Sequence, residues 1–358
     1  MYKVHISPQW IISKNAETPL DTPALIKLLL AIEQTGSIAK AAEAVNLSYR
    51  YSWGLLRSGE KIFTETLIST NRGRGTTLTG LAQKLIWADR RVTARLSPTL
   101  ESLASELEHE LNKDMLEKSA PIRLHASHGF AVAALLNLFN QQQLPTEVRY
   151  RNSTDAVAAL ARKECDLAGF HIPLGEFEAA AIEQFSPSLN PKTHSLVHLA
   201  IRTQGLFVAA GNPKRIQGIA DLNQPELRFV NRQDGSGTRM LLELLLAKAK
   251  ISPSQINGFE NTEFTHSAVA AFIASGMADV GFGVQTAAHR FGLDFIPLLR
   301  ERYFFALPVS ALKNPLFQQA INIIQSDDFR QQVDQLIGYD STDTGKIFTL
   351  QEAFNRVA

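Results

Sequence analysis

The spacing of apolar residues changes near residue 120, and this change divides the chain. Before it, apolar side chains recur every three or four positions, as on the buried face of a helix; Leu25, Leu28, Leu29 and Ile32 form one such series. After it, short apolar runs alternate with helical stretches, which is typical of an α/β domain. The pattern therefore predicts an α/β protein with a smaller helical part at its N-terminal end.

Capping residues divide the helical part further. Three helices are expected over residues 24–33, 38–45 and 49–57, capped by Asp21, Ser37 and Ser48. Strand-forming residues on both sides of a basic, glycine-spaced tip at 71–75 predict a hairpin, with another helix from Thr79 onward. Two helices joined by a tight turn with a hairpin beside them make a winged helix-turn-helix, whose second helix can enter the DNA major groove.

A leucine seam marks a long amphipathic helix between residues 95 and 118. Its members recur every three or four positions: Leu96, Leu100, Leu103, Leu107, Leu111 and Met115. We interpret this helix as a linker that dimerises the DNA-reading part, because a two-fold, pseudo-palindromic operator requires two reading heads. The alternative is a helix that packs only on its own domain.

Composition and charge narrow the function classes. The 358 residues are 45% hydrophobic and 20% charged, enough to bury two or three cores. Cys165 is the single cysteine, which excludes an internal disulfide or a multi-thiolate metal site. The net charge of +1 conceals about ten Lys and Arg against about four Asp and Glu in residues 40–95, an excess suited to DNA phosphates, although a solvated basic face is the alternative. Without a signal-peptide pattern or a long apolar run, we expect a cytoplasmic protein with no membrane contact.

The expected DNA contacts lie on the third helix, at its caps and at the hairpin tip. They are Ser37, Ser48, Tyr49, Arg50, Tyr51, Arg57, Arg72 and Arg74. Trp53 forms a helical stripe with Tyr49 and Leu56 and is expected to pack against the first helix. For the arginines, a purely solvated surface is the alternative.

This segment resembles the DNA-binding segment of bacterial molybdate-responsive repressors and is similar to that of LysR-type regulators. The positions that carry the resemblance are Thr35–Ile38, Ala41, Ala42, Ser48–Trp53, Arg72–Gly75 and Leu78–Gly80. The resemblance implies a transcriptional regulator that binds double-stranded DNA, here as a homodimer or a dimer of dimers.

Polar residues at strand-to-helix junctions indicate a ligand site in the C-terminal part. The most informative run, residues 231–239, has glycines that let N–H groups and hydroxyls converge on an anion at a helix N-terminus; a plain capped turn is the alternative. Ligands of open α/β sheets lie at the carboxyl ends of the strands. The residues expected there are Ser127, His128, Ser153, Thr154, His171, Asn231, Arg232, Gly235, Ser236, Gly237, Thr238, Arg239, Thr265 and His266.

Over about residues 122–308 the chain resembles the periplasmic-binding-protein-like domain of bacterial molybdenum-related proteins. The matching positions are Ala126–His128, Asp166–Gly169, Asn231–Arg239, Thr265, His266, Ala268–Ala270 and Ala278–Gly283. The resemblance implies a two-lobed (type 2) effector domain over 120–358, after a winged helix-turn-helix domain over 1–94 and a linker helix over 95–119. It makes molybdate or tungstate the first expected effector, with no cofactor.

Other ligands and activities stay open. A larger molybdenum-cofactor-like anion or a small organic anion such as formate is the second choice of effector. His128, His171 and His266 could instead form a metal site, or serve an enzyme of molybdenum cofactor metabolism. We expect no enzyme, because no nucleophile and base stand at diagnostic spacing and Cys165 begins an apolar strand, where an inert buried thiol is expected.

Overall fold

The protein is described by a computed structural model, and the mixed α/β class expected from the sequence is confirmed. The described residues are 2–14, 18–71, 75–112 and 120–354. They form two compact units, residues 7–96 and residues 1–6 together with 97–358. Helix α4 (Gly80–Asn112) contributes to both, so the helix that starts after the hairpin and the leucine helix are one. No helix of the described part is long and apolar enough to cross a membrane.

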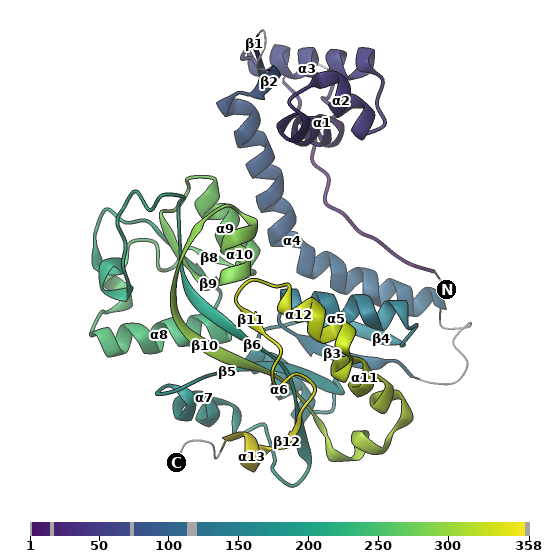
Figure 1. Ribbon diagram of the computed structural model, residues 1–358, viewed down its shortest axis with the longest axis vertical. Coiled ribbons are helices and arrows are strands. Elements are labelled where there is room, and N and C mark those ends of the chain that lie inside the picture. The colour runs from purple at the N-terminus through teal and green to yellow at the C-terminus, as the bar shows by residue number, and fades with distance from the viewer. Residues whose placement is uncertain (1, 15–17, 72–74, 113–119, 355–358) are drawn as a thin grey trace. The chain divides into compact units, whose positions relative to one another are not determined.

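The unit of residues 7–96 contains three helices, a hairpin and the N-terminal half of α4 (Figure 1). Its elements before α4 are α1 (Thr22–Thr35), α2 (Ile38–Ala44), α3 (Tyr49–Phe63), β1 (Ile68–Asn71) and β2 (Gly75–Leu78). The three expected caps are confirmed, since Asp21, Ser37 and Ser48 each accept a hydrogen bond from a backbone N–H in the first turn of the helix they precede. Gly36 ends α1 with φ at 63°, a left-handed conformation that favours glycine.

The face of α3 differs from the sequence prediction. Leu25 and Leu56 are buried in the core of this unit, as expected. Trp53 and Tyr49, however, are 37% and 55% exposed, so the prediction that they pack against the first helix is wrong. Their rings stack on each other with centroids 6.5 Å apart, and the Arg57 guanidinium covers the Trp53 ring at 4.9 Å. Tyr49, Trp53 and Leu56 follow the helical period, but of the three only Leu56 is buried in the core of this unit.

The larger unit is built on one continuous sheet with the strand order β4-β3-β5-β10-β6-β9-β7-β8; β11 and β12 also pair with β6. Its strands are β3 (Ile122–Ala126), β4 (Thr146–Tyr150), β5 (Leu167–Pro173), β6 (His194–Val208), β7 (Phe229–Arg232), β8 (Thr262–Glu263), β9 (Val280–Val284), β10 (Asp294–Pro308), β11 (Tyr339–Asp340) and β12 (Ile347–Thr349). Its helices after α4 are α5 (Phe130–Gln141), α6 (Ser153–Ala161), α7 (Glu178–Phe185), α8 (Gly237–Ala249), α9 (His266–Ala274), α10 (Gln285–Arg290), α11 (Pro315–Gln325), α12 (Asp327–Asp334) and α13 (Leu350–Phe354).

Two long antiparallel strands, β6 and β10, join the two lobes of this unit (Figure 1). On one side, β3, β4 and β5 form a parallel group, with β5 paired to β10. On the other, β7, β8 and β9 form a second parallel group, with β9 paired to β6. Each group carries its own helices, so each lobe is a small α/β layer. The first lobe supplies the strand-to-helix junctions after β3 and β4. The second lobe supplies the junction after β7 and the one before α9.

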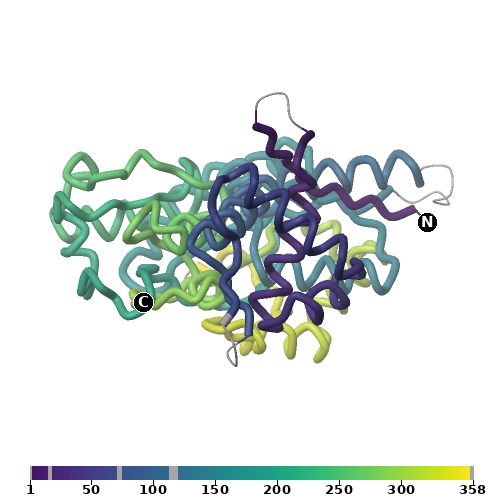
Figure 2. The backbone as a smooth tube through the Cα atoms, turned by 90° about the horizontal axis from the view of Figure 1, so that it is seen from above, coloured from purple at the N-terminus to yellow at the C-terminus, as the bar shows by residue number. Residues whose placement is uncertain are grey.

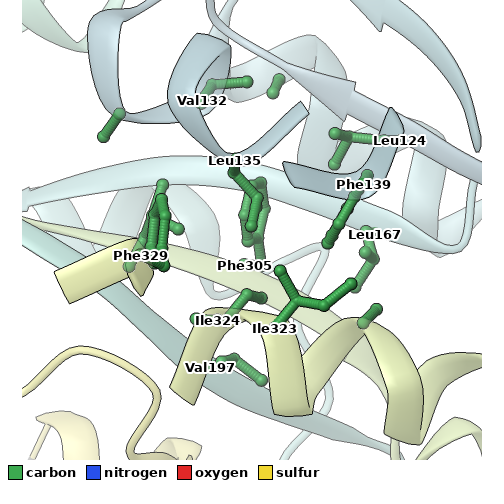
Figure 3. Close-up of a cluster of buried hydrophobic side chains, with 14 of the residues drawn as sticks. Leu124, Val132, Leu135, Phe139, Leu167, Val197, Phe305, Ile323, Ile324 and Phe329 are labelled. Carbon is green, nitrogen blue, oxygen red and sulfur yellow. The ribbon is translucent and has the colours of Figure 1, made fainter. Parts of the chain in front are cut away.

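Separate apolar clusters stabilise the lobes. Figure 3 shows the largest described cluster of the first lobe, in which Phe139 of α5, Phe305 of β10 and Ile323 of α11 pack together with their neighbours. The second lobe has clusters around Phe229 and Phe207. Burial of such side chains contributes about 2 kcal/mol each, so both lobes are rigid supports for the residues at their shared edge.

The C-terminal half of α4 covers the exposed edge of the sheet. The Ser105 hydroxyl accepts a hydrogen bond from the Val148 N–H at 2.9 Å, and the Ser102 hydroxyl accepts one from the Tyr150 N–H at 3.0 Å. These contacts satisfy edge-strand donors of β4 that would otherwise be open to pairing with another chain. Residues 97–112 are therefore an integral layer of the larger unit.

Buried histidines make this unit sensitive to acid. Burial lowers the pKa of His125 and of His198 to about 4, and both side chains are buried in the folded protein. In the unfolded chain they titrate near 6.5, so below that pH the unfolded state binds protons that the folded state does not. Stability is therefore lost as pH falls from 6.5 toward 4, by about 1.4 kcal/mol per pH unit for each histidine.

We expect the thermal unfolding midpoint to decrease between pH 6.5 and 5. His198→Phe, which keeps an aromatic ring against Phe304, should make the decrease smaller. Differential scanning calorimetry at a series of pH values measures both. An identical decrease in the variant would show that His198 does not contribute to the acid sensitivity.

Candidate anion-binding site

A small cavity lies where the N-terminal ends of four helices, α5, α6, α8 and α9, come together between the lobes. Its lining residues are Ser127, His128, Arg151, Asn152, Ser153, His171, Arg202, Arg232, Gln233, Ser236, Gly237, Thr238, Phe264 and His266. The free volume of the cavity is about 10 Å³. Each helix N-terminus carries unpaired N–H groups and a partial positive charge, so four of them at one cavity favour a negative ligand.

Arg202 places a fixed positive charge at the cavity. It lies on β6 opposite Glu301 of β10, and its Nε donates to Glu301 Oε1 at 2.5 Å. Gln204 donates to the same carboxylate oxygen at 2.8 Å and to Thr238 Oγ1 at 3.1 Å. Burial opposes the charge on Arg202, but Glu301 and Tyr339 hold its pKa above the ordinary value. Because Thr238 accepts from Gln204, its own hydroxyl hydrogen is left to donate to another group.

Arg232 adds a second buried positive charge that lacks a counter-ion of its own. It ends β7 and is buried, and its Nη2 donates to the Phe264 carbonyl at 2.7 Å. Its Nε and Nη1 are buried with no hydrogen-bond partner within the described residues. Burial, and then the charge of Arg202, lower the pKa of Arg232 to about 9, so it remains charged at neutral pH. Two arginines against the one carboxylate of Glu301 leave an excess positive charge that an anion would neutralise.

Two of the three histidines that line the cavity, His171 and His266, are neutral. Burial, followed by the nearby arginines, keeps the pKa of His171 and of His266 well below the ordinary value. His171 Nδ1 lies 3.2 Å from the Ser153 hydroxyl, and its ring stacks on Tyr303 with centroids 4.1 Å apart. Its Nε2 is buried without a partner in the described structure. These groups can supply hydrogen bonds to a ligand without adding charge.

Nine of the fourteen residues proposed from the sequence line the cavity. They are Ser127, His128, Ser153, His171, Arg232, Ser236, Gly237, Thr238 and His266. The other five are near it along the chain but do not line it: Thr154, Asn231, Gly235, Arg239 and Thr265. Asn231 and Thr265 bond the backbone instead, through the Phe259 carbonyl and the Ala268 N–H.

Arg239 and Gly235 lie outside the cavity and stabilise the loop before α8 and the helix itself. The Arg239 side chain pairs with Asp234 at 3.0 Å and Glu243 at 3.0 Å, so its charge is already compensated outside the cavity. Gly235 has φ at 73°, and a Cβ there would lie 2.8 Å from the Asn152 side-chain nitrogen. Glycine at this position therefore lets the loop before α8 approach the first lobe closely.

Sequence reasoning missed five lining residues, Arg151, Asn152, Arg202, Gln233 and Phe264. Asn152 could have been found, since it stands directly beside Ser153, and Gln233 lies within the run 231–239 that was singled out from the sequence, although this residue was not named as a contact. No local signal marks Arg202, because it is one arginine inside an apolar strand. Its role depends on Glu301, which lies opposite it on the neighbouring strand. Arg151 is exposed at the end of β4 and also lines the cavity.

Two alternatives lose support in the described residues. No three His, Cys, Asp or Glu side chains of that part are grouped as they would be around a metal ion. Cys165 is buried, and burial raises the pKa of its thiol to about 12, so it is not a thiolate at neutral pH.

The residues proposed to contact DNA lie mostly on the open face of α3. Arg50 is exposed, and within the described residues its side chain makes no ion pair or hydrogen bond. Tyr51 donates its hydroxyl to Asp21 at 3.1 Å, and Arg57 pairs with Glu60 at 3.0 Å. The side chains of Ser37 and Ser48 are used as helix caps. Arg72 and Arg74 lie outside the described residues, as do Met115 and the end of the proposed linker at 119.

One family model matches this chain, and several known proteins are similar to it. A family model described as the PBP superfamily domain matches residues 136–325, more than half of the chain. The chain is similar to the uncharacterized protein YvgK of Bacillus subtilis (strain 168), with 33% identity over 203 residues; the match covers 56% of this chain and 64% of YvgK, slightly under two thirds of that protein. It is also similar to the molybdenum transport protein ModE of Azotobacter vinelandii, at 24% identity over 188 residues, covering 50% of this chain and 68% of ModE. Among solved structures, the Corynebacterium glutamicum OxyR C206 mutant matches with a TM-score of 0.43 and 15% identity, over 87% of this chain and 93% of that chain.

Proposed function

The chain belongs to the family of the PBP superfamily domain, and from this premise we propose that it is a DNA-binding transcriptional regulator that senses a small oxyanion. One observation carries the sensing half of the proposal. Arg232 is a buried cation in a cavity formed by helix N-termini, and two of its donor nitrogens have no partner in the part of the chain that the structure describes. A buried charge without compensation is costly, and an anion in the cavity removes that cost.

Molybdate or tungstate is the preferred ligand within this proposal. The lining combines three arginines, of which Arg202 and Arg232 are buried, with neutral donors from Ser, Thr, His and backbone groups, which suits a small tetrahedral dianion. The similarity to ModE, whose name refers to molybdenum transport, supports the same choice. A molybdenum-cofactor-like anion and formate remain competitors that titration separates.

The smaller unit supplies the DNA-reading half of the proposal. Helices α2 and α3 and the hairpin β1–β2 support the proposal of a winged helix-turn-helix, in which α3 would enter the major groove. The exposed face of α3 holds Tyr49, Arg50 and Trp53, and aromatic and arginine side chains are common contacts to phosphates and base edges. The Arg50 guanidinium has no competing protein partner in the described residues, which makes it the strongest candidate contact.

We expect Arg50→Ala to weaken operator binding about tenfold and to lower the slope of log affinity against log salt by about one. The measurement is fluorescence anisotropy with an operator selected from random duplex DNA by the purified chain. Lys313→Ala removes one exposed charge from the other unit and is the matched control. Equal affinity and salt slope for Arg50→Ala and the control would contradict the assignment of α3.

Dimerisation is part of the proposal. Four leucines on one face of α4, Leu96, Leu103, Leu107 and Leu111, are exposed in the single chain. The opposite face of the same helix packs on β4 through Ser102 and Ser105, so the helix can hold its own unit and a second copy at once. A two-fold arrangement of this kind would present two copies of α3 to a pseudo-palindromic operator.

A further inference from the structure

The cavity wall meets α4 at one acidic residue, Glu101. His128, which lines the cavity, places its Nε2 3.4 Å from Glu101 Oε1, and its ring lies edge-on to Tyr150 with centroids 4.9 Å apart. Burial disfavours the charged carboxylate, but hydrogen bonds from His128 and Tyr150 outweigh this and hold the pKa of Glu101 below its ordinary value. The Glu101 carboxylate is therefore an internal anionic partner of His128, which lines the cavity.

The N-terminal residues are attached to the same part of α4. Asn112 accepts a hydrogen bond from the Tyr2 N–H at 2.7 Å and donates one to the Tyr2 carbonyl at 2.9 Å. His5 and Glu101 line one groove, and His5 lies near enough to favour the charged form of Glu101. Figures 1 and 2 both show the N-terminal end beside the C-terminal half of α4.

These contacts stand at the two places where the chain passes between its units, after Ile6 and after Leu96. His5 immediately precedes the first crossing, and Glu101 follows the second by little more than one helical turn. Pro98 lies between Leu96 and Glu101 and cannot donate a backbone hydrogen bond, which weakens the helix at this point. Both covalent connections to the DNA-reading unit are therefore anchored close to Glu101.

We propose that Glu101 couples the cavity to the DNA-reading unit: a bound anion competes with Glu101 for His128, and the release of Glu101 loosens α4 and the N-terminal residues at both crossings. This inference rests on the proposed function. In the empty protein, the Glu101 carboxylate pairs with His128; in the liganded protein, the anion pairs with it instead. Two negative groups close to one histidine repel each other, so each disfavours the other.

The test is the coupling ratio, the operator dissociation constant without molybdate divided by that with saturating molybdate. In Glu101→Gln, which keeps the side-chain length and removes the charge, we expect this ratio to move toward one by at least fivefold. Molybdate affinity, measured by calorimetry, should rise two- to tenfold, because the competing carboxylate is gone. Glu106→Gln makes the same charge change at an exposed position of the same helix and should alter neither value.

A second measurement needs no variant. Hydrogen exchange of the full chain should become faster at the backbone amides of residues 2–6 and 97–112 when molybdate is added, and Asn112→Ala should produce part of this increase without molybdate. If the unchanged chain couples molybdate to DNA and Glu101→Gln couples them equally, this inference is wrong while the proposed function stands. If the unchanged chain binds neither molybdate nor tungstate, the proposed function fails and this inference with it.

Discussion

Replacing Arg232 by methionine should abolish oxyanion binding and at the same time make the empty protein more stable. The side chain is a buried cation with two donors that have no partner among the described residues, and burial already lowers its pKa to about 9. Without a ligand its charge is a cost, so an apolar side chain of similar length should raise the unfolding free energy by about 1 kcal/mol. With a ligand the same charge is the partner of the anion, so affinity should fall at least about 100-fold, or about 2.7 kcal/mol.

Arg239→Met is the matched control, since it changes the same residue type seven positions later. Arg239 is compensated by Asp234 and Glu243 and does not line the cavity. We expect this variant to lose stability and to keep its oxyanion affinity within about twofold. Calorimetry measures the oxyanion affinity of both variants, and thermal unfolding measures their stability. Opposite signs for stability, together with a binding loss confined to Arg232→Met, are the expected result; equal behaviour would remove Arg232 from the site.

Replacing Leu103 and Leu107 together by aspartate should dissociate the dimer and remove most operator affinity. The two side chains are 46% and 42% exposed on α4 in the single chain, so each would lose about 1 kcal/mol of apolar burial per copy at a two-fold interface. The dimer dissociation constant should therefore rise at least about 100-fold, and operator affinity should fall by a similar factor because the two reading heads then bind separately. Analytical ultracentrifugation and fluorescence anisotropy measure the two effects.

The same aspartate variant should still bind molybdate, because neither leucine lines the cavity. Leu103→Met with Leu107→Met keeps the apolar surface and should remain dimeric. A wild-type chain that sediments as a monomer at micromolar concentration would contradict the role given to this face of α4. So would an aspartate variant that stays dimeric.

Local signals predicted the N-terminal elements well, because they depend on a few neighbouring residues. The caps Asp21, Ser37 and Ser48 and the left-handed Gly36 lie where expected. The prediction failed at Trp53, since helical spacing shows which residues share a face but not whether another element covers that face. An exposed aromatic on the helix proposed to read DNA is better explained by function than by packing.

Strand β10, which joins the two lobes together with β6, was not predicted from the sequence. Its sequence from Asp294 to Pro308 contains two prolines and four charged residues and shows no clean alternation. It is a strand because β5 and β6 hold it on both sides, which is a tertiary effect that overrides local propensity. Glu301 lies on this strand, so the sequence could not reveal the carboxylate that orients Arg202. The helix-start residues and Arg232 were visible in the sequence, whereas Arg202 and Glu301 were not.

The central claim is that the cavity around Arg232 takes a small oxyanion, and calorimetric titration of the unmodified chain with molybdate tests it most directly. We expect saturable binding of one molybdate per chain, similar binding of tungstate, and weaker binding of sulfate and formate. No binding of any of these anions would contradict the claim, and sulfate bound as tightly as molybdate would contradict the choice of ligand.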